Sequence, residues 1–411
     1  MEAWEKVLVS EDFLADRHFA EFFFSDCTWC HGGDDSAEAR AAAHEGMDPY
    51  PSLADSEMCG GACHGDETEM FHTGLHYDNR GIVHPERSQI ALRAGEETLP
   101  AIQEALGNHC ADCHSKACGD CHITRPRYSE GGFVKGHVFY STPKATLNCT
   151  GCHGSRVEKE MLAKGGLDFE GEVVETKYDV HWNPNAMSCD VCHGGHDADL
   201  AEVYHRYDRP DAPRCEDCHQ QQITDAGNQM HAVHALAGGE APMLQCQVCH
   251  SQPYNNCRGC HLKQSEQGSC YYDLDKSWFD FKIGKNPLES AERPYDYVVL
   301  RHVPVDRDTF SHYGDDLLTR FDDLPTWKYA TPHNVIKEID VDGEPQPPPQ
   351  ARGCNSCHGH PELFLTAEVV EQVDPEELEA NSEVIVDSIP GPLEGDGGPG
   401  PGPDGGPDGG V

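Results

Sequence analysis

The stretch NHCADCHSKACGDCHITRP, residues 108–126, decides how the whole chain is interpreted. Within these nineteen positions the motif Cys-x-x-Cys-His occurs twice, at Cys110–His114 and at Cys118–His122. The second copy begins eight residues after the first, so the groups that the two copies bind must lie close together. A pattern this dense calls for a count of the motif along the rest of the chain.

The motif recurs over most of the sequence. Nine segments fit Cys-x-x-Cys-His, and a tenth, Cys59–His64 (CGGACH), has one extra residue between its cysteines. These ten segments use 20 of the 21 cysteines and leave only Cys270, which we expect to be a stray thiol. The nine regular segments are Cys27–His31 (CTWCH), Cys110–His114 (CADCH), Cys118–His122 (CGDCH), Cys149–His153 (CTGCH), Cys189–His193 (CDVCH), Cys215–His219 (CEDCH), Cys246–His250 (CQVCH), Cys257–His261 (CRGCH) and Cys354–His358 (CNSCH).

Composition narrows the class of protein. Hydrophobic residues make up 37% of the 411 residues, below the usual globular share, so something other than side chains is expected to fill part of the interior. The formal charge of −42 repels nucleic acid and anionic lipid, although it serves equally well to keep a surface solvated. No run of about 20 apolar residues occurs, so we expect no membrane span.

Several chemistries use paired cysteines, and the histidine separates them. Structural zinc favours Cys-x-x-Cys units without an obligatory following histidine. A redox dithiol needs one motif on an α/β scaffold, and a disulfide framework does not place histidine after every second cysteine. In haem c attachment, two cysteines form thioethers to the porphyrin and the adjacent histidine ligates iron. The two intervening residues place both sulfurs on one side of a helical turn.

The sequence therefore predicts haem c at nine sites and, by virtue of the flexible Gly60 and Gly61, at a tenth, where the alternatives are a free thiol pair or a disulfide. The predicted thioether cysteines are Cys27, Cys30, Cys59, Cys63, Cys110, Cys113, Cys118, Cys121, Cys149, Cys152, Cys189, Cys192, Cys215, Cys218, Cys246, Cys249, Cys257, Cys260, Cys354 and Cys357. The predicted proximal iron ligands are His31, His64, His114, His122, His153, His193, His219, His250, His261 and His358.

The remaining histidines supply candidates for the distal side of each iron. Sixteen of the 26 histidines lie outside the motifs, whereas there are only eight methionines and none has a fixed place, so bis-histidine ligation is expected. A lone histidine precedes several motifs, and we expect it to ligate a neighbouring haem more often than its own. The preferred distal set is His18, His76, His84, His137, His181, His205, His231, His234, His302 and His333. Six others stay undecided: His44, His72, His109, His196, His312 and His360.

The expected fold is mostly coil with short α-helices wrapped around a chain of closely packed haems, with little β-structure, because Gly, Pro, Asp and Asn interrupt the helical patterns. Residues 100–113 and 156–166 are the clearest predicted helices. The motifs divide the chain into an N-terminal haem region at 1–130, central haem modules at 131–265, a motif-free aromatic region at 266–345, a C-terminal motif with an acidic segment at 346–390, and a Gly/Pro/Asp tail at 391–411 that is expected to be disordered.

With these motifs the chain resembles the multihaem c-type cytochromes over about residues 18–360. The resemblance implies redox work and haem attachment outside the cytoplasm. The N-terminus lacks the basic and apolar regions of a signal peptide, so we expect a periplasmic or cell-surface protein whose leader is absent from this sequence. Expected partners are redox proteins such as basic cytochromes, quinol-oxidising membrane complexes, or metal ions or oxides as acceptor; oligomer or filament assembly stays open.

Two functions fit this class. The favoured one is electron transfer in respiration or to extracellular acceptors, with every iron six-coordinate; a terminal metal reductase overlaps with it. The alternative is an oxidoreductase similar to the octahaem enzymes of small nitrogen or sulfur compounds, with one open haem and a pocket built from 271–340. Its candidate pocket residues are Lys282, Lys285, Tyr297, Arg301, Arg307 and Lys328. The gap from His261 to Cys354 departs from the even spacing of decahaem outer-membrane conduits, and no Cys-x-x-Cys-Lys motif like that of the pentahaem nitrite reductases occurs.

Overall fold

The structure is a computed structural model of the chain. Four predicted site residues lie outside the residues that it describes: Cys27, Cys113, His114 and His205. The described residues are 18, 28–53, 57–61, 63–77, 80–84, 88–110, 117–124, 132–134, 137–183, 185–196, 200–204, 207, 209, 212–224, 229–236, 239, 241–303, 306–336 and 354–393.

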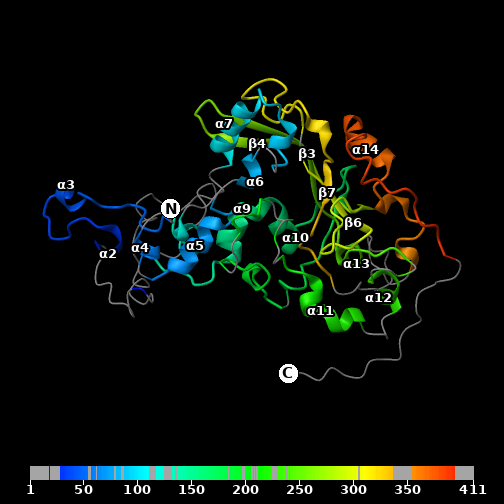
Figure 1. Ribbon diagram of the computed structural model, residues 1–411, viewed down its shortest axis with the longest axis horizontal. Helices are drawn as coiled ribbons and strands as arrows, with labels where there is room; N and C mark the ends of the chain where they lie inside the picture. Colours follow the sequence, from blue (N-terminus) through cyan, green and yellow to red (C-terminus); the bar gives the residue numbers. More distant parts are fainter. Residues whose placement is uncertain are drawn as a thin grey trace. The chain divides into compact units, whose positions relative to one another are not determined.

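The described helices are short, the longest having 11 residues. They are α2 (Thr28–His31), α3 (Arg40–Ala43), α4 (Glu57–Gly60), α5 (Gly65–Thr73), α6 (Arg80–Val83), α7 (Leu99–His109), α8 (Cys118–His122), α9 (Thr150–His153), α10 (Lys159–Met161), α11 (Cys215–Thr224), α12 (Gln229–His234), α13 (Cys246–His250) and α14 (Ala367–Val373) (Figure 1). Single turns of 3₁₀-helix lie at 91–93, 189–191, 321–323, 354–356, 361–363 and 375–377, and π-helical turns at 145–149 and 154–158.

Helix α7 shows how the sequence sets these elements. Pro100 stands in its first turn, where the missing N–H costs nothing. Ile102, Ala105 and Leu106 recur at helical spacing and are fully buried. The helix then runs directly into Cys110, as predicted for residues 100–113, so the apolar face of α7 holds the start of one motif in place.

The described β-structure consists of three small sheets, and the sequence did not predict its longest strands. Strands β3 (Tyr254–Gln264) and β4 (Cys270–Asp280) form a hairpin of two 11-residue strands, and β1 (Gly166–Leu167) pairs with β2 (Val173–Val174). The third sheet has the order β5 (Lys282–Lys285), β6 (Tyr297–His302), β7 (Trp327–Tyr329), all antiparallel. Residues 271–340 contain many aromatic and β-branched side chains. These pack well on the half-buried surface of a sheet and therefore favour strands.

The chain forms two compact units, each built from separated segments. The first contains residues 1–155, 188–212 and 264–271, and the second contains 156–187, 213–263 and 272–411. The division by motifs proposed from the sequence stays a prediction.

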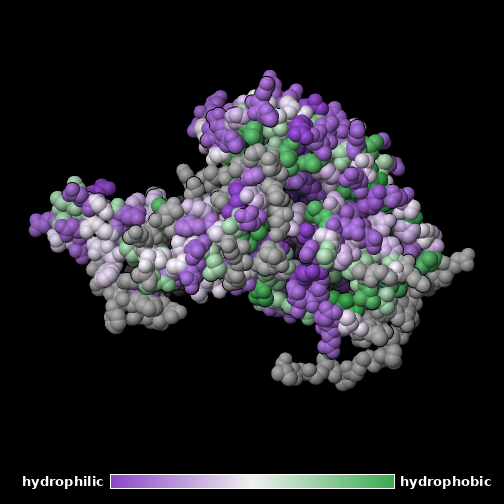
Figure 2. Space-filling model, in the orientation of Figure 1, coloured by the Kyte–Doolittle hydropathy of each residue, from purple (hydrophilic) through white to green (hydrophobic). Residues whose placement is uncertain are grey.

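The apolar core of the second unit lies around the three-stranded sheet. Nine buried residues form one cluster: Val248, Tyr254, Phe281, Ile283, Val299, Ala330, Leu363, Phe364 and Val386. In the first unit half of the described buried apolar residues are alanine, and the larger ones are Phe71, Ile102, Leu106, Ile123 and Val203. Figure 2 shows hydrophilic residues over most of the visible face, with hydrophobic ones in scattered patches. The expectation that something other than side chains fills part of the interior stays a prediction.

A cap residue in the second unit gives a first prediction. The Thr366 side chain accepts a hydrogen bond from the backbone N–H of Val369 and caps α14. A Thr366→Ala variant is expected to lose about 1 kcal/mol of unfolding free energy, because that N–H loses its partner. Urea denaturation measures the loss, and Glu371→Ala on the exposed side of the same helix serves as the control. Equal stability of the two variants would contradict the capping role.

Candidate functional site

Most described motifs lie on short helical turns, as the attachment chemistry predicts. The Cys118–His122 and Cys246–His250 motifs coincide with α8 and α13, and Cys215 begins α11. Each motif on such a turn holds its two sulfurs on one side and carries its histidine at the end of the turn. The residues just before two of these helices, Ala117 and Gln245, have non-helical backbone angles. Each of the two helices therefore begins at the first cysteine of its motif.

Six motif histidines each face a histidine from outside the motifs. The ring centroids are 6.1–6.3 Å apart in every one of these six pairs. Four pairs lie in the first unit and two in the second. They are His64 with His18, His31 with His137, His153 with His76, His122 with His196, His219 with His181, and His250 with His231.

The separation of the rings fits two ligands on opposite sides of one metal ion. A metal bonds an imidazole nitrogen at about 2 Å, and the ring centroid lies about 1 Å further from the metal, so two such rings have centroids about 6 Å apart. The interplanar angles run from 17° to 83°, whereas the distances hardly vary. Two rings that bind one metal along a shared axis would keep a fixed centroid distance, while each ring could take any rotation about that axis.

Ordinary aromatic packing would give a wider range of centroid distances than these six pairs show. Aromatic pairs occur at any centroid distance from about 4.5 to 7 Å. Histidine contacts with Phe, Tyr and Trp in this chain follow that spread, from 4.1 Å for His137 with Phe133 to 6.2 Å for His196 with Phe71. The six histidine pairs differ in their narrow range and in joining one motif residue to one other histidine each time.

Backbone carbonyls fix the orientation of the paired rings. The Nδ1 atom of His31 lies 2.8 Å from the oxygen of Asp48, and that of His122 lies 2.6 Å from the oxygen of Tyr140. A carbonyl can only accept, so Nδ1 carries the proton and Nε2 keeps the lone pair that binds a metal.

Both partners of one pair are held in this way. The Nδ1 atom of His250 lies 3.2 Å from the oxygen of Ile336, and that of His231 lies 3.0 Å from the oxygen of Gln222. In the other pair of the second unit, Nδ1 of His181 lies 3.3 Å from the carboxylate of Asp179. Asp179 also accepts the backbone N–H of Val335, so it is itself fixed in place. Such outer partners raise the basicity of a ligating ring.

Burial favours the neutral form of three of these rings. It lowers the pKa of His153 and His250, and it lowers the pKa of His137 with a smaller contribution from repulsion by His31. Neutral imidazole is the form that binds a metal.

The first cysteines of different motifs also meet in pairs. The Cys59 thiol donates a hydrogen bond to Cys118, which raises the pKa of Cys59 and lowers that of Cys118 to about 7. Cys149 stands in the same relation to Cys189, whose pKa is lowered to about 7, and Cys246 to Cys215. All 19 cysteines in the described part of the chain are free thiols, so none of these pairs is a disulfide.

The other predicted distal ligands lie in different surroundings. The ring of His84 packs against Tyr204 at 4.7 Å, and Nδ1 of His234 lies 2.8 Å from the oxygen of Pro242. The backbone N–H of His333 donates to Glu160. His302 is fully buried with both ring nitrogens engaged, by the oxygen of Cys257 at 2.6 Å and by Glu377 at 2.8 Å. Both ring nitrogens of His302 are thus engaged by the protein, and the ligand role expected for it stays a prediction.

Sequence reasoning left His196 undecided, although the structure pairs it with His122. The signal was present, since His196 follows the motif histidine His193 by three residues in CHGGH. The preferred distal histidines of the recurring modules precede a motif, whereas His196 follows one. His44 shows the contrast: it is exposed, and its Nδ1 faces the oxygen of Arg40 in its own turn.

The Cys257–His261 motif differs from the others because it lies in strand β3 and not on a helical turn. Residues three apart in a strand point to opposite faces, so the predicted placement of both sulfurs on one turn is not found here. Gly259 interrupts the strand with a φ of +59°, which glycine adopts at little cost. His261 faces the carboxylates of Asp275 and Asp308 at 3.3 and 3.6 Å. Haem attachment at this motif stays a prediction.

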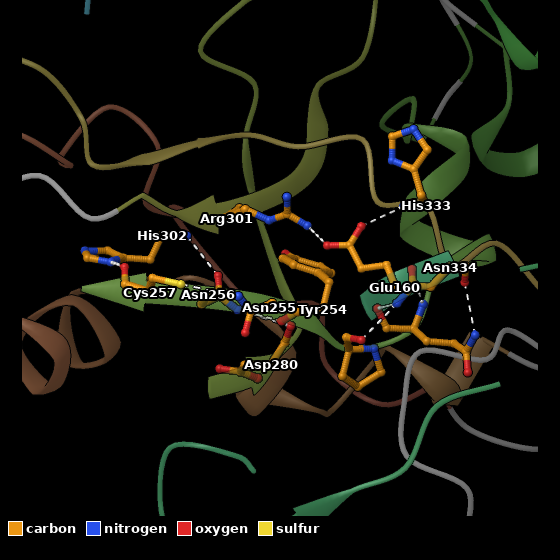
Figure 3. A network of polar contacts seen from close by, with 12 residues as sticks. Glu160, Tyr254, Asn255, Asn256, Cys257, Asp280, Arg301, His302, His333 and Asn334 are labelled. Carbon is orange, nitrogen blue, oxygen red and sulfur yellow. Dashed lines mark hydrogen bonds and ion pairs between the residues drawn. The ribbon is translucent and has the colours of Figure 1, made fainter. Parts of the chain in front are cut away.

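The residues proposed for a substrate pocket are instead tied into ion pairs and backbone contacts. Arg301 pairs with the fully buried Glu160 and stacks over the ring of Tyr254 at 5.1 Å (Figure 3). Lys282 donates to the carbonyl of Glu362 at 2.6 Å and lies 3.1 Å from Asp280. Lys285 pairs with Asp387 at 3.0 Å, and Arg307 lies 3.9 Å from Glu376 with its guanidinium over Phe321. Tyr297 and Lys328 lie in the paired strands β6 and β7.

Other kinds of site were sought in the same residues. Within the described ranges, no three His, Cys, Asp or Glu side chains gather into a protein-only metal site. None of the helices in the described part of the chain has the length and apolar character that a membrane crossing requires. No family model, curated protein or solved structure matches this chain.

Proposed function

We propose that this chain is a multihaem c-type cytochrome that carries electrons outside the cytoplasm, in respiration or toward an extracellular acceptor. The six pairs of histidines at 6.1–6.3 Å support this function most directly. Each pair combines one histidine that follows two cysteines with one distant histidine, which is what a covalently attached, bis-histidine haem requires. The motif cysteines would hold the porphyrin by thioether bonds.

When bound, haem c supplies an iron that cycles between Fe(II) and Fe(III). The chain's own residues orient and enclose it. The carbonyls of Asp48 and Ile336 accept from Nδ1 of His31 and His250, which would leave Nε2 of each ring for the iron, and burial lowers the pKa of His250. At the six paired sites, two histidines would hold each iron and would leave no position for a substrate, which suits a carrier better than an enzyme.

The negative charge of the chain favours partners of opposite charge. A formal charge of −42 attracts basic proteins and cations and accelerates their association. We therefore propose basic redox proteins, membrane quinol-oxidising complexes, or metal ions or oxides as its electron donors and acceptors. The extracytoplasmic location rests on the attachment chemistry implied by the motifs.

The oxidoreductase alternative has less support. It needs one iron with an open position and a pocket of free cationic or acidic groups. The proposed groups Lys282 and Arg301 are buried and engaged by Glu362, Asp280 and Glu160. A six-coordinate carrier is therefore the better proposal.

The test is a haem count and a spin-state measurement on the full chain produced in a host that attaches haem c. We expect nine or ten haems by the alkaline pyridine assay and by intact mass, with low-spin ferric signals in the electron paramagnetic resonance spectrum. A sizeable high-spin ferric signal would favour the oxidoreductase. A colourless protein with free thiols or bound zinc would refute both functions.

A further inference from the structure

The contacts between different motifs carry information about the order of the sites. We name each predicted attachment site after its first cysteine. The inference below rests on the proposed function, since it concerns the arrangement of haems that the chain is proposed to bind.

Neighbouring sites in the first unit are linked by backbone as well as by sulfur. The backbone N–H of Cys118 donates to the carbonyl of Ser52 at 2.8 Å, and Leu53 forms a β-bridge with Ala117. This brings the chain just ahead of Cys59 against the start of the Cys118 motif, where the two thiols form their hydrogen bond. The Cys59 and Cys118 sites are therefore neighbours.

The same unit extends this contact to the Cys149 motif. The Cys121 thiol interacts electrostatically with Cys149. The side chain of Asn148 donates to the carbonyl of Thr124, which ties the Cys149 motif to the end of the Cys118 motif. A thiol hydrogen bond then links Cys149 to Cys189.

The second unit contains a shorter run of contacts. Cys215 and Cys246 share a hydrogen bond. Cys357 packs against the apolar cluster that contains Val248, and it interacts with the neighbouring Cys249. The Cys246 site thus has the Cys215 site on one side and the Cys354 site on the other. Cys257 has other contacts, with Asn255 at 3.3 Å and Ser277 at 3.8 Å.

From these contacts we infer that the haem sites form two ordered series, Cys59–Cys118–Cys149–Cys189 in the first unit and Cys215–Cys246–Cys354 in the second, and that neighbours in a series exchange electrons directly. A thioether sulfur is separated from the macrocycle by a single carbon, so sulfurs in contact bring two macrocycle edges together. In each exchange one Fe(II) becomes Fe(III) as its neighbour's Fe(III) becomes Fe(II), and no bond forms or breaks.

The second unit allows a sharp test, because its series has a defined centre. Three double variants each remove one haem: Cys246→Ala with Cys249→Ala at the centre, Cys354→Ala with Cys357→Ala at the end, and Cys257→Ala with Cys260→Ala as the matched control. Intact mass verifies the loss of one haem in each. Soret circular dichroism reports the coupling between neighbouring haems as a split signal.

Removing the central site is expected to abolish both the Cys215–Cys246 and the Cys246–Cys354 couplings, whereas removing the Cys354 site is expected to leave the Cys215–Cys246 coupling intact. The control is expected to leave the Cys215, Cys246 and Cys354 couplings intact. Equal losses from the central and the control variants would overturn the order. If a variant does not mature, cryo-electron microscopy of the intact haem-loaded chain decides instead, because the Cys215 and Cys246 sulfurs must then be adjacent. A haem-free chain would contradict the proposed function itself, whereas a haem-loaded chain with another order would contradict only this inference.

Discussion

A Glu160→Ala variant is expected to lose about 3–5 kcal/mol of unfolding free energy, the usual cost of breaking a buried ion pair by removing one partner. The Glu160 side chain is fully buried, and its carboxylate accepts hydrogen bonds from Arg301 and from the backbone N–H of His333 (Figure 3). Without it, the guanidinium of Arg301 would remain in the interior with its charge uncompensated. Urea denaturation followed by circular dichroism measures the loss.

A neighbouring glutamate gives a matched control for this prediction. Glu158 lies two residues earlier and pairs with Lys164 at 2.8 Å, with both side chains partly exposed. Glu158→Ala is expected to cost no more than about 1 kcal/mol, because water screens an exposed pair. Similar losses in the two variants would show that burial does not set the strength of the Glu160 contact.

The size of the effect follows from what Glu160 connects. It lies in α10, while Arg301 lies in β6 and His333 follows β7, so one carboxylate ties a short helix to the three-stranded sheet. Tyr254 of β3 completes the packing, since the guanidinium lies over its ring and its hydroxyl donates to the carbonyl of Leu300. Arg301, one of the candidate pocket residues, thus links α10 to the sheet in the described arrangement.

The helical turns that carry most of the described motifs could be predicted from the sequence because the spacing is local. The proposed attachment requires two sulfurs and one imidazole to meet one macrocycle from a single turn, which would fix the spacing of three residues such as Cys246, Cys249 and His250. Helix α7 was predictable for a similar reason, since its pattern of apolar residues lies within one segment.

The partners of the motif histidines could be predicted only in part, because a distal histidine is brought in by the fold. His76 meets His153 and His137 meets His31 across long stretches of chain, and no spacing rule connects them. His302 shows the converse. It carries the same imidazole, yet its place between Cys257 and Glu377 depends on how β3, β6 and the C-terminal segment pack.

The strands escaped prediction for a physical reason as well. The motif in Cys257–His261 indicated a helical turn, whereas pairing with β4 holds the same residues in an extended strand. Strand preference depends on cross-strand partners more than on the segment itself. In β4 Ser277 lies 3.8 Å from the Cys257 sulfur, and the next two residues, Trp278 and Phe279, are buried.

The ligand pair with the least support from sequence gives the prediction with the largest spectroscopic effect. A His196→Ala variant of the haem-loaded chain is expected to convert one haem from low-spin to high-spin ferric iron, because His122 would be left as the only axial ligand. The 6.2 Å separation of the two rings and the hydrogen bond from His122 Nδ1 to the carbonyl of Tyr140 set this expectation. Electron paramagnetic resonance of the oxidised protein measures the new signal against the remaining low-spin signals.

His44→Ala is the matched control, since His44 is exposed and bonded within its own turn, and it should leave the spectrum unchanged. His196→Met should restore the low-spin state with a higher reduction potential at one haem, because a thioether ligand stabilises Fe(II). A His196→Ala spectrum identical to that of the unaltered protein, at the same haem content, would show that another residue ligates this iron.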